Sequence, residues 1–111
     1  MTATTVSIGR NVGDDTLSDE AWSDFREAVL DQLDHAGLDI VFAGRGQGYW
    51  TPEDGDTVEE EAFTAVALGS PRFALAPRFA ALARQYGQEA IAVTTGETHL
   101  VTAAQHLAVT A

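Results

Sequence analysis

Two arginines and two aromatic residues have side chains suited to binding a small molecule. Arg10 lies at the end of the first predicted strand, and Arg45 lies in a glycine-rich run, residues 44–48, that leads into Tyr49 and Trp50. Glycines allow a ligand to approach the backbone closely, and guanidinium groups beside aromatic rings can bind a carboxylate, a phosphate or a planar base. The alternative is that the aromatic rings pack the edge of a hairpin while both arginines pair with surface acids.

The histidines offer a second candidate site, for acid/base chemistry. His99 follows the last predicted strand and could form an acid/base pair with a carboxylate across the sheet. No two histidines have the helical spacing of a zinc site and the chain has no Cys, so we predict no metal site and no cofactor. No stretch carries a catalytic signature, so we assign no catalytic residue.

Acidic residues recur along one face of the first predicted helix. Steps of four and three place five carboxylates there, about 5–6 Å from their neighbours, and the five are Glu20, Asp24, Glu27, Asp31 and Asp34. We call this set the acidic ridge. It resembles a row of phosphates and could bind a basic protein; the alternative is a solvated helix face.

A second acidic run, residues 53–61, surrounds a predicted turn. An oxygen-rich loop of this kind could hold a divalent cation, but the run does not have the EF-hand register. We interpret it as a polar hairpin tip.

Composition limits the classes of partner. The chain has 111 residues and a formal net charge of -11, and its six basic residues are all Arg. Such a charge should repel nucleic acids and anionic membranes, and leaves basic proteins, cations and neutral small molecules as partners. We find no signal peptide and no apolar run of about 20 residues, so we expect a cytoplasmic protein.

The order of elements predicts a ferredoxin-like fold. Alternating or apolar runs predict strands at residues 4–11, 39–50, 58–68 and 89–95. Ser18 caps a helix that ends near Gly37, and a second helix follows Pro71, either kinked at Pro77 or preceded by a short turn. This βαββαβ order predicts one α+β domain, residues 1–111, with a four-stranded antiparallel sheet and two helices on one face. Its core would span about residues 4–101, and residues 102–111 would form a tail.

The other face of this sheet is then open. Its predicted residues are uncharged: Thr5, Ser7, Val41, Ala43, Phe63, Ala65, Ala90 and Ala92. Because exposed uncharged strips in a charged protein usually mark an interface or a ligand face, we expect a homodimer packed sheet to sheet. The alternative is a monomer whose tail covers this face.

The same segments carry a resemblance. The sequence resembles small uncharacterised proteins of actinobacteria and their phages. The segments that carry the resemblance are a strand ending at Gly9, the helix start at Leu17-Ser18 with Trp22 and Phe25, the run Gly46-Gln47-Gly48-Tyr49-Trp50, Glu60-Glu61 and residues 83–91. They are more distantly similar to a bacterial domain family of unknown function. This resemblance implies the fold and brings no activity or catalytic residues.

We therefore expect a small acidic, non-enzymatic binding protein, such as a phage accessory factor that binds a basic host protein through the acidic ridge. One alternative is a dimeric α+β-barrel protein that binds or transforms a small molecule, with Arg10, Arg45, Tyr49, Trp50 and His99 as its ligand contacts. Another is a structural subunit of a larger particle.

Overall fold

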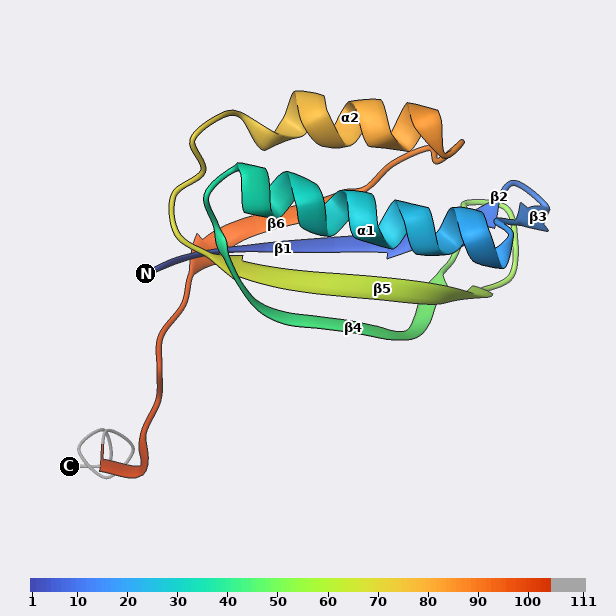
Figure 1. Ribbon diagram of the computed structural model, residues 1–111. Coiled ribbons are helices and arrows are strands. Elements are labelled where there is room, and N and C mark those ends of the chain that lie inside the picture. The colour runs from blue at the N-terminus through green and yellow to red at the C-terminus, as the bar shows by residue number, and fades with distance from the viewer. Residues whose placement is uncertain (105–111) are drawn as a thin grey trace.

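The computed structural model of the chain describes residues 1–104, and Figure 1 shows a sheet with two helices on one side of it. Residues 105–111, the end of the predicted tail, lie outside the described residues. The elements in chain order are β1 (Thr2–Gly9), β2 (Asn11–Val12), β3 (Asp15–Thr16), α1 (Asp19–His35), β4 (Asp39–Trp50), β5 (Val58–Leu68), α2 (Leu75–Gln85) and β6 (Ala92–Glu97).

The main sheet has the strand order β4-β5-β1-β6, and every neighbouring pair is antiparallel. Both crossovers carry their helix on the same side (Figure 1), as right-handed connections require. The predicted ferredoxin-like βαββαβ architecture is confirmed. The small β2–β3 hairpin, between β1 and α1, was not predicted.

The sequence determines both ends of α1. The Ser18 side chain accepts a hydrogen bond from the Ala21 backbone N–H at 3.1 Å and so caps the first turn. After the helix, Gly37 has a φ of 79°, a conformation that favours glycine. Between these ends, residues at helical spacing form the buried stripe, and they are Trp22, Phe25, Val29 and Leu33.

Pro77 lies inside the first turn of α2, which begins at Leu75. A proline is tolerated there because the first backbone N–H groups of a helix have no intrahelical acceptor. The short turn before the helix, one of our two alternatives, is therefore the arrangement found.

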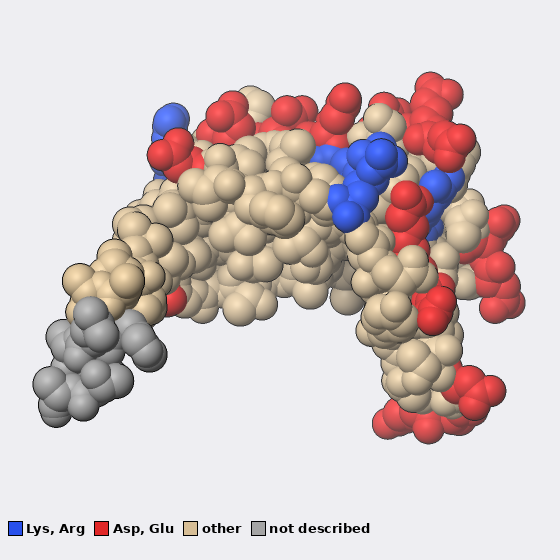
Figure 2. Space-filling view, turned by 90° about the horizontal axis from the view of Figure 1, so that it is seen from below, with Lys and Arg blue, Asp and Glu red and all other residues tan. Residues whose placement is uncertain are grey.

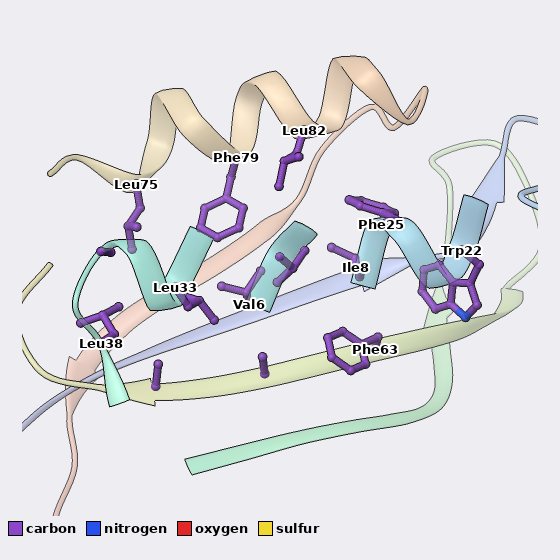
Figure 3. Packing of buried hydrophobic residues seen from close by; sticks show 14 residues of the cluster. Val6, Ile8, Trp22, Phe25, Leu33, Leu38, Phe63, Leu75, Phe79 and Leu82 are labelled. Atoms are coloured by element: carbon purple, nitrogen blue, oxygen red, sulfur yellow. The ribbon is translucent and has the colours of Figure 1, made fainter. Parts of the chain in front are cut away.

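The core lies between the sheet and the helices (Figure 3). Phe79 and Leu82 of α2 point toward α1, while Val6 and Ile8 point up from β1. The Phe25 ring stacks on Tyr86 with their centroids 4.5 Å apart, and burial raises the pKa of the Tyr86 hydroxyl, with a further contribution from Asp24. These contacts fix α1 and α2 against each other.

The open face is uncharged as predicted, but its residues in β5 differ. Phe63 and Ala65 are buried beneath the helices, so their assignment to the open face is wrong. Ala43 of β4 pairs with Ala65 and shares its face, so its assignment to the open face is wrong as well. The open face instead carries Ala62, Thr64 and Val66 of β5 beside Thr5 and Ser7 of β1. Figure 2, seen from the side away from the helices, shows a broad surface without charge, bordered by acidic side chains and some Arg side chains.

Within residues 1–104, no helix is long and apolar enough to cross a membrane. The same part of the chain holds no group of three or more His, Cys, Asp or Glu placed to bind a metal ion.

Candidate functional site

A groove of about 480 Å³ lies where the far ends of the β4–β5 hairpin meet the end of β1 and the start of β6. We call it the hairpin groove. Four separate segments line it, and their residues are Ser7, Ile8, Gly9, Asn11, Gly13, Gly48, Tyr49, Trp50, Glu60, Ala62, Gly87, Gln88, Glu89, Ala90 and Ala92. The fold assembles these segments because β5 and β6 both pair with β1.

Glu60 supplies a carboxylate held in a fixed position. Its Oε2 accepts a hydrogen bond from the Asn11 backbone N–H at 2.8 Å. The Asn11 backbone oxygen accepts a hydrogen bond from the Gln88 Nε2 at 3.1 Å. Asn11 thus links the carboxylate to the loop after α2, while the Glu60 Oε1 has no hydrogen-bond partner among the described residues.

Glycine makes room for this carboxylate. A Cβ at Gly9 would lie 2.3 Å from the Glu60 Oε1 and 2.5 Å from its Oε2, closer than any real contact. On the other side, Gly48 pairs with Glu60 across the β4–β5 ladder, and a Cβ there would lie 3.1 Å from that of Ala62. A larger residue at position 9 would therefore displace the Glu60 carboxylate from this position.

Two aromatic residues at the end of β4, Tyr49 and Trp50, line the hairpin groove. Tyr49 is 65% exposed and Trp50 is 48% exposed. Large aromatic rings left half open to solvent beside a fixed carboxylate provide flat apolar surfaces on which a planar ligand can stack.

The groove has one sign of charge. Glu60 and Glu89 line it, and none of the described lining residues is Lys, Arg or His. A groove with aromatic walls and only negative side chains favours a ligand that has both a ring and a positive charge, and disfavours a phosphate or a carboxylate.

Arg10 lies beside the groove but faces away from it, and its guanidinium group is hydrogen-bonded to other residues of the chain. Its Nε donates to the Leu17 carbonyl oxygen at 2.8 Å, and its Nη1 and Nη2 donate to Glu61 and Asp19 at 2.7 Å each. The hydrogen bond to Glu61, and then the one to Asp19, raise the pKa of Arg10 above its ordinary value. Arg10 joins β1, β5 and the start of α1, which is the pairing with acids stated as our alternative.

The structure does not bring the other predicted ligand contacts to the groove. Arg45 pairs with Phe63 in the ladder and is exposed. His99 follows the far end of β6 from Ala92, the β6 residue in the groove. Of the five residues predicted to contact a ligand, only Tyr49 and Trp50 therefore line it.

The acidic ridge is exposed along α1 on the helix layer, away from the hairpin groove. Its binding of a basic partner stays a prediction.

Glu60 was missed as a site residue because we assigned residues 53–61 together to a polar hairpin tip. The strand predicted at residues 58–68 is the observed β5, and it contains Glu59, Glu60 and Glu61; what we did not consider is which face of the strand each acid would occupy. Alternation along the strand sends Glu60 to the groove and Glu61 to Arg10. Three consecutive acids at the start of a predicted strand were the available signal, because alternation must place Glu60 on the face opposite to Glu59 and Glu61.

No family model matches the chain, and no curated protein matches it. Among solved structures, the chain is similar to a phage SAM lyase in complex with S-methyl-5'-thioadenosine, with a TM-score of 0.62 and 18% identity over 86% of this chain and 80% of that chain. A phage SAM lyase in the apo state matches with a TM-score of 0.57 and 19% identity, over 86% and 78% of the two chains. At this identity the likeness establishes a shared fold.

This finding contradicts our expectation of a non-enzymatic binding protein, because both matching structures are of an enzyme with this fold. The resemblance to phage proteins is supported to the extent that these neighbours come from phage; an actinobacterial origin and the domain family of unknown function are not.

Proposed function

We propose that this protein is a lyase that cleaves S-adenosylmethionine (SAM) in the hairpin groove and releases S-methyl-5'-thioadenosine. The observation that carries the proposal is the lining of the groove: Tyr49 and Trp50 beside the Glu60 and Glu89 carboxylates, with no basic side chain among the described lining residues. SAM combines an adenine ring with a sulfonium and an ammonium group, so it has the ring and the positive charge that this lining favours. The fold shared with a phage SAM lyase supports the same reaction.

In this reaction the bond between the sulfonium sulfur and the methionine γ-carbon breaks, and its electron pair goes to sulfur, which becomes a neutral thioether. A new double bond in the remaining fragment requires a base to take one proton, whereas ring closure by the substrate's own carboxylate requires none. The free Glu60 Oε1 can serve the first route as the base and the second by holding the substrate's ammonium group. An NMR spectrum of the second product distinguishes the two routes.

The loss of charge during the reaction suits an acidic groove. The substrate enters as a cation and the thioether product leaves neutral, so the Glu60 and Glu89 carboxylates attract the first more strongly than the second. Negative charge at the site therefore helps capture of the substrate and release of the thioether, whereas a lactone product formed by ring closure keeps its ammonium charge.

The experiment is incubation of the purified protein with SAM, followed by chromatography for S-methyl-5'-thioadenosine. We expect the thioether to accumulate with enzyme concentration and above the slow spontaneous breakdown of SAM. S-adenosylhomocysteine, which has the same ring but a neutral sulfur, should bind more weakly and remain intact. Thioether formation no faster than in buffer would refute the proposed reaction.

The uncharged open face remains our proposed homodimer interface. It is supported by the absence of charged side chains at its centre, where the Ser7 and Thr64 hydroxyls hydrogen-bond at 2.9 Å. Sedimentation equilibrium of Thr64→Arg tests it: a guanidinium at this position should dissociate a sheet-to-sheet dimer, and an unchanged mass would contradict this interface.

A further inference from the structure

The hairpin groove offers counterparts for two of the three charged groups of SAM. SAM carries a sulfonium, an ammonium and a carboxylate, and the Glu60 and Glu89 side chains can attract the two cations. None of the described lining residues is Lys, Arg or His, so the substrate's carboxylate has no ion-pair partner among them. A carboxylate placed beside Glu60 and Glu89 would instead be repelled by both.

The arginines of the neighbouring elements are bonded or placed elsewhere. Arg10 donates from all three of its guanidinium nitrogens to other residues of the chain. Arg45 pairs with Phe63, which is buried beneath the helices, so Arg45 lies on the helix face of the sheet. Glu60 lies on the opposite face, because it precedes Phe63 by three residues in the same strand. Arg84 lines a different groove, between α2 and β6.

Neutral polar groups of the lining are also bonded within the chain. The Asn11 backbone N–H donates to the Glu60 Oε2 at 2.8 Å, and the Gln88 Nε2 donates to the Asn11 backbone oxygen at 3.1 Å. The Ser7 hydroxyl is hydrogen-bonded to that of Thr64 at 2.9 Å. These groups therefore do not compensate the charge of a substrate carboxylate, which water solvates well.

We propose that the hairpin groove recognises the adenine ring and the two cationic groups of SAM and leaves the carboxylate in solvent. This inference rests on the proposed function and extends the ligand class to adenosyl sulfonium amines that lack a carboxylate. Decarboxylated SAM keeps the ring, the sulfonium and the amine, and has one more net positive charge than SAM. It should bind at least as tightly as SAM, because the repulsion between the carboxylate and the two glutamates is removed.

These two ligands form a matched pair for the test. The protein is mixed rapidly with SAM or with decarboxylated SAM, and tryptophan fluorescence is recorded before turnover. Trp50 reports on the groove, since it lines it and is half exposed, whereas Trp22 is buried in the core. We expect the dissociation constant of decarboxylated SAM to be about fivefold lower, as for the loss of one unfavourable charge contact near the surface.

A dissociation constant of decarboxylated SAM above that of SAM would overturn this inference, because the groove would then bind the carboxylate. The proposed reaction would survive that result, provided that SAM still yields the thioether. Absence of quenching by either ligand, together with no thioether formation from SAM, would instead refute the proposed function itself.

The Glu89 carboxylate gives a second test. Glu89→Gln removes one of the two negative charges of the groove, so it should weaken the binding of decarboxylated SAM more than that of SAM and bring the two dissociation constants closer together. Glu59→Gln is the matched control, because Glu59 is exposed in β5 and does not line the groove. The control should leave the ratio of the two constants unchanged. An equal change of the ratio in both variants would assign it to the net charge of the chain and overturn the inference.

Discussion

The hairpin groove and the helix groove, which has about 750 Å³ and lies between α2 and β6, share Gln88, Glu89 and Ala90. Their chemistry nevertheless differs. The hairpin groove has aromatic walls and a carboxylate held by a backbone N–H, whereas the helix groove is apolar and contains an unpaired hydroxyl. The first is suited to a cationic small molecule and the second to an apolar group. The net charge of -11 belongs to the whole chain and does not explain why the two grooves differ. The difference comes from a few side chains and from the strand edge beside each groove.

The largest effect should follow loss of the fixed carboxylate. Glu60→Gln keeps the shape of the side chain but removes its charge, and we expect the rate of thioether formation to fall by about 1000-fold, within the range for a positioned acid/base or charged group. Glu59→Gln is the matched control, since it makes the same change one residue earlier in β5, where Glu59 is exposed and does not line the groove. Similar losses in both variants would contradict a special role for Glu60.

The space beside the carboxylate gives the next test. Gly9→Ala would place a methyl group where the Glu60 carboxylate now lies, and a displacement of about 1 Å can cost about 100-fold in rate. Gly46→Ala, in β4 on the other side of β5, has nothing within 4 Å of the added Cβ and should retain activity. Circular dichroism checks that both variants fold, and full activity of folded Gly9→Ala would show that the position of Glu60 is unimportant.

A smaller effect is expected from the aromatic wall. Trp50→Ala removes a stacking surface and should raise KM about tenfold, in line with the loss of one base-stacking contact. Because Trp22 is buried in the core and Trp50 is half exposed, quenching of tryptophan fluorescence by S-methyl-5'-thioadenosine should occur in the unmodified protein and be lost in Trp50→Phe. Quenching that survives in Trp50→Phe would place the ligand elsewhere.

The smallest effect on activity should come from substitution of Arg10, which lies next to the groove but stabilises the fold. Arg10→Met removes the bonds to Leu17, Glu61 and Asp19, so we expect a lower thermal midpoint with KM unchanged at a temperature where the variant is folded. A large rise in KM without a change in midpoint would instead make Arg10 a ligand contact, as its sequence position first indicated.

The fold could be predicted because local signals agree along the chain. The hairpin arms, β4 and β5, have the predicted bounds, and the Ser18 cap and the apolar stripe of α1 lie where helical spacing places them. The face of β5 could not be predicted, because alternation defines two sets of residues without saying which one the helices cover. Phe63 was assigned to the wrong set for this reason.

The site was harder to predict because its residues are distant in the sequence. Gly9, Gly48, Glu60 and Gln88 come together only once the register of the sheet is known. Tyr49 and Trp50 were recognised from residue type. The arginines near them in the sequence suggested an anionic ligand, whereas the structure keeps Arg10 and Arg45 out of the groove and leaves carboxylates in it.

The most direct test of this account is a crystal structure of the protein with S-methyl-5'-thioadenosine bound. We predict that the ligand occupies the hairpin groove, with its adenine against Tyr49 or Trp50 and its sulfur near the Glu60 carboxylate. Binding in the helix groove between α2 and β6, or on the open face away from Glu60, would contradict the account.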